Sequence, residues 1–419
     1  MKQAWLIAMV IMTVALQAGW FSPEKKLVVR HAPPMDVSYE KREAMSLLNE
    51  IREAMGMNTL VHNDQLAQAA QAHADYLVKN RVTSHGEIPG RPGFTGRTPA
   101  ERALHAGYLS TQVSENLSTK NRDARSSIDG LFSAIYHRFG FLDVGIDEIG
   151  VGAAQDVHHT ENSAFVYVMG NSYLNALCHE RAFKGYGRYV YGVCRDKRHR
   201  IAQKRFLEAQ DANRRYNPKI VCYPYDGQKD VPPSFYDEMP DPLPDYEVSG
   251  FPVSVTFNAY FFKRVELVSF TLTRSDGKPV GPLRLLSAKN DPNGRFTPYQ
   301  FALFPLHRLE YDTEYQAKII YKEQGRKMSR SWYFHTRKFS EPILRITKQE
   351  ATITIRPHKS YLLYLVPRNG HDVVKSATFP EDLYVEFLDN NTLRIKLMSE
   401  NGRSFDIKSK KRVIHVNVK

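Results

Sequence analysis

Apolar residues recur at three- and four-residue spacing over two segments near the start of the chain, which is typical of helices with one buried face. The spacing predicts one helix from Ser38 to Gly56 and a second after Asn63-Asp64, a dipeptide suited to capping a helix N-terminus. The pattern is carried by Leu47, Leu48, Ile51 and Met55, and then by Leu66, Ala69, Ala70, His73 and Leu77. We interpret His73 as a core residue because it shares the apolar seam of its helix.

Between residues 80 and 175 the helical spacing of apolar residues gives way first to a loop and later to strands. Residues 80–107 are rich in Gly and Pro and predict a loop, and a third helix is expected over about Ser126–Tyr136. Residues 148–152 and 165–169 carry β-branched and aromatic side chains and are expected to be strands. Helices and strands that segregate in this way indicate an α+β domain, which we place at 38–175.

A proline-rich segment then separates this domain from a β-rich second half. Residues 223–249 contain six prolines and predict an extended, stiff linker, because proline supports neither a helix nor a central strand. Beyond it, short alternating segments between turn signals predict an Ig-like β-sandwich over 250–339 and a small β domain over 343–419. The expected strands include 253–257, 267–272, 315–320, 351–355, 361–366, 383–388, 392–397 and 412–418.

The N-terminus has the order of a secretory signal peptide. Lys2 precedes an uncharged apolar run, Ala4–Ala18, which is followed by the small residue Gly19. We assign residues 1–21 to the signal, with cleavage near 18/19, and expect an extracellular or periplasmic protein. The alternative is a retained anchor, because Ala4–Phe21 carries no charge although the run is short for a membrane span of about 20 residues.

The charge of the chain favours anionic partners. Lys and Arg number 58 against 45 Asp and Glu, a formal net charge of +13. Residues 176–222 are expected to be a basic helical connector, and 195–216 is either a patch for anionic polymers or a solvated helix. Expected partners are an anionic envelope component, a lipid, a glycan or a protein, with membrane contact only through a retained anchor. Nucleic-acid binding is disfavoured because no groove-reading motif accompanies the charge.

Three cysteines are present, at 178, 194 and 222. In an exported protein we predict that Cys178 and Cys194 are bridged, which leaves Cys222 free. Three unpaired thiols remain the alternative, because sequence does not show whether two Cβ vectors meet.

Short motifs follow one another in a fixed order through the first domain. They are Leu48-Asn49-Glu50-Ile51-Arg52, His73-Ala74, Ser84-His85-Gly86-Glu87, Gly93-Phe94-Thr95-Gly96-Arg97, Ala106-Gly107-Tyr108, Ser114-Glu115-Asn116-Leu117, Tyr136-His137-Arg138 and Glu148-Ile149-Gly150-Val151-Gly152. Together they resemble the CAP superfamily (SCP/PR-1-like: cysteine-rich secretory protein, antigen 5, pathogenesis-related 1) over about a third of the chain. The resemblance implies an α-β-α sandwich with a cleft lined by two histidines and two acids, which some members use to hold a divalent metal. Residues 250–255, 301–306 and 331–334 resemble the Ig-like modules that often accompany bacterial CAP domains.

Carried onto this sequence, the resemblance makes His85 and His137 the two histidines and Glu115 one of the acids. The position of the second acid falls at Ala134, and Asp129 is out of register. Two imidazoles and a carboxylate suit zinc. We therefore expect a weakly bound divalent metal, with a hydrogen-bonded polar cleft that holds no metal as the alternative.

Several signatures of hydrolytic enzymes are missing from the sequence. It contains no Gly-x-Ser-x-Gly elbow, no His-Glu-x-x-His helix and no phosphate-binding Gly-x-x-x-x-Gly-Lys loop. We therefore predict a non-catalytic, exported binding protein whose cleft receives a small amphiphile, a peptide or a glycan. The alternative is a metal-assisted hydrolase of the peptidase type that uses His85, Glu115 and His137, none of which we firmly assign as catalytic.

Overall fold

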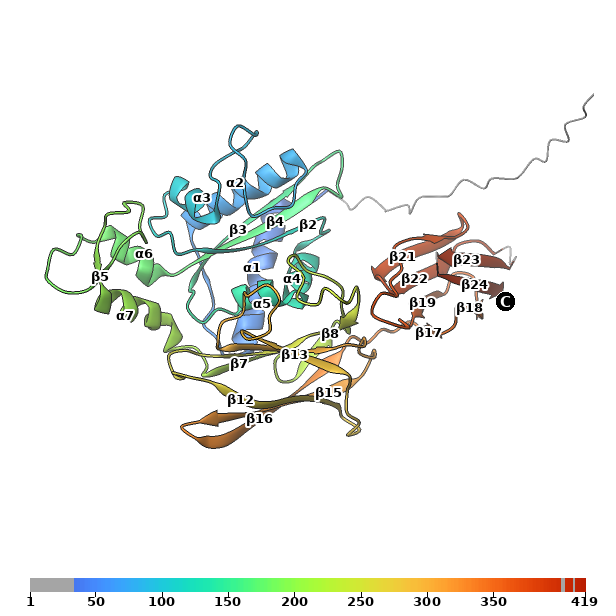
Figure 1. The fold of residues 1–419 in the computed structure, drawn as a ribbon. Coiled ribbons are helices and arrows are strands. Elements are labelled where there is room, and N and C mark those ends of the chain that lie inside the picture. The colour runs from blue at the N-terminus through green and yellow to red at the C-terminus, as the bar shows by residue number, and fades with distance from the viewer. Residues whose placement is uncertain (1–33, 401–403, 410) are drawn as a thin grey trace, which may run out of the picture.

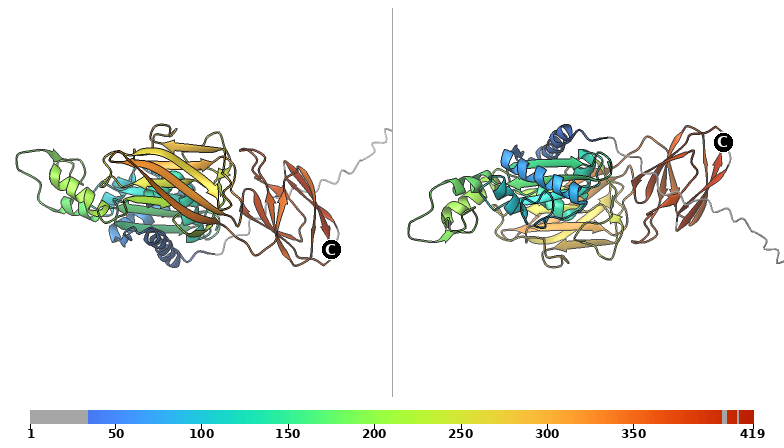
Figure 2. Two further views of the ribbon diagram at one scale, coloured as in Figure 1. Left: turned by 90° about the horizontal axis from the view of Figure 1, so that it is seen from below. Right: turned by 90° about the horizontal axis from the view of Figure 1, so that it is seen from above.

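The computed structural model describes residues 34–400, 404–409 and 411–419; the predicted signal peptide, 1–21, lies outside the described residues. The chain forms an α+β part, a β-sandwich that packs against it and a C-terminal β part (Figures 1 and 2). Within the described residues, no helix is both long enough and apolar enough to cross a membrane.

The α+β part is a four-stranded sheet between two layers of helices (Figure 1). The strand order is β1-β3-β4-β2, with β1 parallel to β3 and the other pairs antiparallel. The strands are β1 (Val61–His62), β2 (Ser114–Thr119), β3 (Glu148–Gln155) and β4 (Ser163–Gly170). One face packs on α2 (Asp64–Asn80) and α3 (Pro99–His105), and the other on α1 (Val37–Ala54), α4 (Ala124–Ser133) and α5 (Ile135–Phe141). The predicted α-β-α sandwich is confirmed.

The central strand β4 is buried along its whole length, because helices cover both faces of the sheet. Phe165, Tyr167 and Met169 pack toward α1 and α4, and the alternate residues Ala164, Val166 and Val168 pack toward α2. Two glycines of β3 allow α2 to lie directly on the sheet. A Cβ at Gly150 would stand 2.0 Å from the Leu66 carbonyl carbon, and one at Gly152 would stand 2.3 Å from that of Ala70.

The capping residue predicted for the second helix and the glycine predicted to end the first are confirmed, whereas the third expected helix is divided. The Asn63 side chain accepts hydrogen bonds from the first backbone amides of α2, and Gly56 adopts φ +71° just after α1. The single helix expected over about 126–136 is two helices, because Ala134 is extended, with ψ 116°, and separates α4 from α5.

A lobe formed by residues 172–214 projects from the α+β part, at the end of the molecule opposite the C-terminal part (Figure 2). It comprises α6 (Ser172–His179), β5 (Tyr189–Val190), β6 (Ile201–Ala202) and α7 (Gln203–Arg214), so the basic segment 195–216 is helical only from Gln203. Cys178 and Cys194 form a disulfide with Cα atoms 5.5 Å apart, and Cys222 is free and buried.

The β-sandwich consists of two four-stranded sheets, ordered β13-β14-β11-β7 and β12-β15-β16-β8, beside a short β9–β10 hairpin. The strands are β7 (Ile220–Tyr223), β8 (Gln228–Val231), β9 (Ser234–Phe235), β10 (Ser249–Gly250), β11 (Val253–Phe257), β12 (Glu266–Arg274), β13 (Leu283–Ser287), β14 (Gln300–Pro305), β15 (Glu314–Glu323) and β16 (Arg326–Thr336). Apolar residues of the sandwich and of α1 and α4 belong to one continuous core. The two parts are therefore packed together as one body.

The segment expected to be a linker, 223–249, is packed against the sandwich instead. It contains β8 and β9, and Val231, Phe235 and Leu243 within it are almost fully buried. Burial of the apolar side chains between the prolines removes apolar surface from water and so stabilises this packing. Proline content therefore marked a segment of irregular backbone and not a domain boundary.

The C-terminal part is also built from two four-stranded sheets, β17-β19-β22-β21 and β18-β24-β23-β20. The strands are β17 (Ile343–Ile346), β18 (Glu350–Ile355), β19 (Ser360–Leu365), β20 (Ala377–Thr378), β21 (Leu383–Asp389), β22 (Thr392–Leu397), β23 (Phe405–Ser409) and β24 (Arg412–Val418). The strands expected from alternation between 351 and 418 are confirmed, with small shifts at their ends. Arg308 joins this part to the sandwich by donating to Asp389 Oδ2 at 2.7 Å.

Candidate functional site

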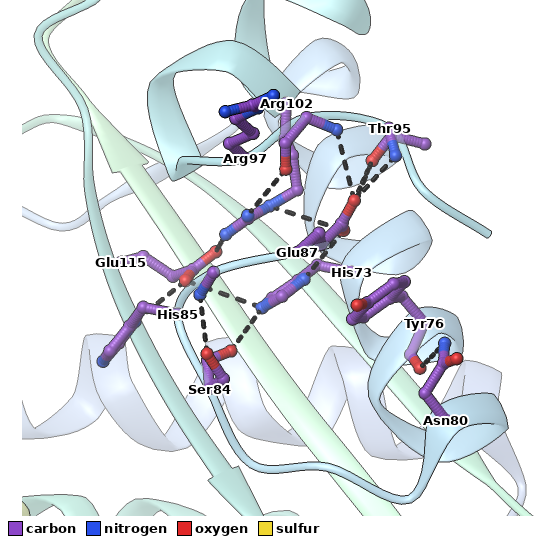
Figure 3. Close-up of polar contacts among 12 residues, drawn as sticks. His73, Tyr76, Asn80, Ser84, His85, Glu87, Thr95, Arg97, Arg102 and Glu115 are labelled. Atoms are coloured by element: carbon purple, nitrogen blue, oxygen red, sulfur yellow. Dashed lines mark hydrogen bonds and ion pairs between the residues drawn. The ribbon is translucent and has the colours of Figure 1, made fainter. Parts of the chain in front are cut away.

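A buried network of charged side chains connects α2, the loop that follows it and β2 (Figure 3). His73 on α2 is fully buried, and its two ring nitrogens lie 2.9 Å from Glu87 Oε1 and 3.0 Å from the Ser84 carbonyl oxygen. Both neighbours, the Glu87 carboxylate and the Ser84 carbonyl group, are hydrogen-bond acceptors. His73 is a core residue, as predicted, but it is also a member of this network.

Glu87 is held as a carboxylate by the donors around it. Its Oε2 accepts from the backbone amides of Thr95 at 2.6 Å and Gly96 at 3.2 Å. Burial alone would raise the pKa of this carboxyl, but the hydrogen bonds from His73 and from these amides, together with the charge of Arg102, outweigh burial and lower it.

Glu115 on β2 divides its two oxygens between a buried partner and an exposed one (Figure 3). Oε2 accepts from Arg102 Nη2 at 2.6 Å, and Oε1 lies 2.9 Å from His85 Nδ1. The Glu115 and Arg102 side chains are fully buried, whereas the His85 side chain is 47% exposed. The buried Glu115 carboxylate thus fixes the orientation of the exposed His85 ring.

His137 is held in the same way, but by a carboxylate from the β-rich half of the chain. Its Nδ1 lies 2.7 Å from Oε1 of Glu238, a residue between β9 and β10. The same oxygen accepts from the backbone amides of Tyr136 at 2.9 Å and His137 at 3.1 Å. Ala134 provides no side-chain cap for α5, so Glu238 takes that role from a distant segment.

The two histidine–carboxylate pairs lie next to each other. The rings of His85 and His137 are stacked, with centroids 6.2 Å apart and planes inclined by 23°. The Asn116 side chain, next to Glu115 in sequence, donates to the His137 carbonyl oxygen at 2.7 Å and so links β2 to α5. In each ring Nδ1 faces a carboxylate, and Nε2 has no partner among the residues that the structure describes.

The residues on either side of His137 fix α5 to the β-sandwich. Tyr136 donates to Asp291, and Arg138 donates to the Pro252 carbonyl oxygen at 2.7 Å. The guanidinium of Arg138 also lies over the rings of Tyr223 and Phe251, at 4.9 and 4.8 Å. Each residue of the Tyr136-His137-Arg138 motif therefore contacts the β half, and the position of His137 depends on that contact.

The structure places the three predicted site residues, His85, Glu115 and His137, in one location. The resemblance implies a second acid in the cleft, but Ala134 stands at its position. Glu238 supplies a carboxylate to His137 instead, and it was not predicted from the sequence. No local signal pointed to it, because it lies in the segment interpreted as a linker. Asp129 lies apart from the two pairs, and its carboxylate is 3.7 Å from Arg337.

The carboxylates are oriented toward imidazoles and not toward a shared metal position. Glu115 has both oxygens committed, and within the described ranges no group of three or more His, Cys, Asp or Glu side chains is arranged to hold a metal ion. The arrangement does not fit the three-ligand site that a catalytic zinc requires. Weak metal binding therefore stays a prediction, with the Nε2 atoms of His85 and His137 as the available donors.

Comparison with known proteins agrees with the motifs in the first domain. The sequence profile of the cysteine-rich secretory protein (CAP) family matches residues 45–171. A search of curated proteins gave no match to the chain.

Solved structures similar to part of the chain come from several bacteria. An extracellular protein containing an SCP domain from Bacillus anthracis is 20% identical over 32% of this chain and 40% of that one, with a TM-score of 0.28. An outer surface protein from Borrelia burgdorferi is 20% identical over 32% of this chain and 95% of that one, with a TM-score of 0.29. A cysteine-rich secretory protein from Staphylococcus aureus is 17% identical over 33% of this chain and 40% of that one, with a TM-score of 0.25. The chain therefore spans less than half of the Bacillus and Staphylococcus proteins.

The matched segment, 45–171, begins in α1 and ends after β4, so it covers the α-β-α sandwich and contains His85, Glu115 and His137. Glu238 lies outside it. Residues 45–171 thus form a CAP domain, and all-β modules follow it in the chain.

Proposed function

We propose that this protein is an exported, non-catalytic binding protein whose CAP domain receives a small amphiphile, a peptide or a glycan at the His85–His137 pair. The observation that carries the proposal is the pairing of each ring with its own carboxylate, which leaves Nε2 as the free polar atom. Side chains held in this way form a preorganised binding surface, because they lose little rotational freedom when a ligand arrives.

The chemistry of the free atoms favours a ligand with hydroxyl or N–H groups. When an imidazole donates its Nδ1 proton to a carboxylate and is otherwise neutral, its Nε2 is an acceptor. Sugar hydroxyls, peptide amides and the polar end of an amphiphile all supply matching donors. The His85 side chain is 47% exposed and that of His137 is 16% exposed, so both are open to such a group.

The absence of an activated nucleophile supports binding over catalysis. Among the described residues, no Ser, Thr or Cys side chain forms a hydrogen bond with the ring of His85 or His137. A serine or cysteine nucleophile that is activated by a histidine base makes that contact. The alternative, a metal-assisted hydrolase, would have only the two Nε2 atoms as protein ligands, one fewer than catalytic zinc sites use.

The proposal is tested by NMR of the protein labelled at the histidine rings, with triglycine, chitotriose and palmitate as probes. Signals of His85 and His137, assigned by His85→Gln and His137→Gln, should shift with at least one probe, while the exposed His62 should not respond. His62→Gln is the matched control variant. Unshifted site signals with all three probes would contradict the proposal. Cleavage of triglycine or chitotriose with added zinc would replace it with the hydrolase.

A further inference from the structure

The projecting lobe carries a basic loop, residues 181–200, that the proposed function does not use. Together with Glu180, this segment contains seven Lys or Arg residues and two acids. It stands at the opposite end of the molecule from the C-terminal part (Figures 1 and 2). A strong positive charge at one end gives the molecule a preferred orientation in the field of an anionic partner.

Most of this charge is not neutralised within the protein. Four residues of the basic loop are exposed and form no ion pair with any residue that the structure describes: Arg181, Lys184, Arg188 and Lys197. The two acids have partners of their own, since Glu180 pairs with Arg205 and Asp196 lies 3.7 Å from Arg198. The four free cations are therefore available to an external anion.

Tyrosines alternate with these cations and point outward. Tyr186 is fully exposed, Tyr191 is 66% exposed and Tyr189 is 44% exposed. Only Tyr189 is covered by a cation of the loop, with Arg200 at 5.0 Å from the ring centroid. Exposed aromatic side chains grouped in this way are uncommon on a surface that faces only water, and they mark an interaction site.

The backbone of the basic loop is fixed at several points. The Cys178–Cys194 disulfide closes its base, and Phe183 N donates to the Arg200 carbonyl oxygen at 2.7 Å. Thr111 N donates to the Val193 carbonyl oxygen at 2.9 Å, which connects the loop to the α+β part. A partner would therefore meet a surface that is already ordered, at a low entropic cost.

We propose that the basic loop docks the protein on the surface of an anionic lipid bilayer. Lys and Arg side chains bind acidic headgroups, and tyrosine is favoured at the boundary between headgroups and acyl chains because its ring is apolar and its tip is polar.

A bilayer fits this surface better than an anionic polysaccharide does. The cavity at the base of the lobe, of about 310 Å³, is lined by the disulfide, Leu109, Arg195, Asp196 and His199 and by none of the three tyrosines. With each of the three tyrosines at least 44% exposed, the rings offer an open surface to a partner, whereas sites for small ligands are concave.

The experiment measures sedimentation of the full chain with vesicles of phosphatidylcholine alone or mixed with phosphatidylglycerol. The wild type should prefer the anionic vesicles, and the preference should weaken with salt. A quadruple variant, Arg181→Gln, Lys184→Gln, Arg188→Gln and Lys197→Gln, should lose about tenfold or more of that preference. The readout is the ratio of binding to anionic and to neutral vesicles. The apolar N-terminal run is uncharged and should contribute equally to both, so its contribution cancels.

A matched control removes four charges from exposed positions elsewhere: Lys289→Gln, Arg326→Gln, Lys327→Gln and Lys348→Gln. It should retain the preference, and circular dichroism should show both variants folded. A second variant, Tyr186→Ser with Tyr191→Ser, should weaken vesicle binding without changing retention by dextran sulfate. Equal loss in the control and the test variant would overturn the proposal. Binding to dextran sulfate without binding to anionic vesicles would also overturn it, in favour of a polysaccharide partner.

Discussion

At the scale of single residues, the site depends on how each carboxylate divides its hydrogen bonds. Glu115 holds the exposed His85 with one oxygen and the buried Arg102 with the other, and Glu87 holds His73 while it accepts backbone amides. In this network the carboxylates of Glu87 and Glu115 face Arg102 and His73. A buried group of this kind is tolerated only when its charges are paired and hydrogen-bonded.

The lowered pKa of Glu87 predicts a specific pH dependence of stability. A carboxyl with a depressed folded-state pKa stabilises the fold above its ordinary value of 4.5, and this contribution is lost as the pH falls through the folded-state pKa. We expect Glu87→Gln to be less stable than the wild type at pH 7 and the difference to shrink between about pH 5 and pH 3. Urea unfolding across this range measures the difference.

Glu53 provides the control for that series, because it is exposed and forms no ion pair with the residues that the structure describes. Glu53→Gln should follow the wild-type pH curve. A Glu87→Gln curve that runs parallel to the wild type down to pH 3 would show that Glu87 is not held as a carboxylate in the fold.

Some residues of the site could be predicted from the sequence and others could not. His85, Glu115 and His137 stand in short motifs, so the resemblance located all three. Glu238 contacts His137 across 101 positions, and no periodicity or spacing connects the two. Arg102 was not predicted as a site residue, because arginines are mostly exposed and nothing in the sequence marks this one as buried. Only the fold shows its burial.

At the scale of helices and strands, periodicity predicted most elements because the core-facing residues of each element repeat. One exception is the segment 126–136, where an extended Ala134 divides one expected helix into α4 and α5. Apolar spacing does not register this break, because the residues on both sides of it are buried. The break places the amides of Tyr136 and His137 at a helix N-terminus, where they face Glu238.

The contact of α2 with β3 predicts unequal effects of two glycine substitutions. Gly150→Ala would place a Cβ 2.0 Å from the α2 backbone and should destabilise the fold by about 3 kcal/mol through overpacking. Gly130→Ala, inside α4 with nothing within 4 Å of the added Cβ, should stabilise it by about 0.5–1 kcal/mol. Urea unfolding of both variants measures the two effects. A Gly150→Ala variant as stable as the wild type would show that α2 does not rest on the sheet at this point.

At the scale of the whole molecule, the candidate site is shared between parts that are far apart in sequence. His85 and Glu115 belong to the CAP domain alone, whereas His137 is held by Glu238 and lies on a helix anchored to the sandwich through Tyr136 and Arg138. The sequence predicted the parts but not their packing, because the segment that joins them was interpreted as a linker. The β half is therefore part of the site and not only an attached module.

A double-mutant cycle between His137→Ala and Glu238→Ala tests most directly whether the β half completes the site, with the free energy of unfolding as the readout. The backbone hydrogen bonds that Glu238 accepts cancel in the cycle, which leaves the contact between the two side chains. We predict a coupling of about 1.5–3 kcal/mol, the range for a hydrogen bond to a charged group. A control cycle of Glu238→Ala with His62→Ala, an exposed ring that bonds to Asp64, should give a coupling below about 0.5 kcal/mol. A coupling between His137 and Glu238 no larger than in the control would contradict the claim that the β half completes the CAP site.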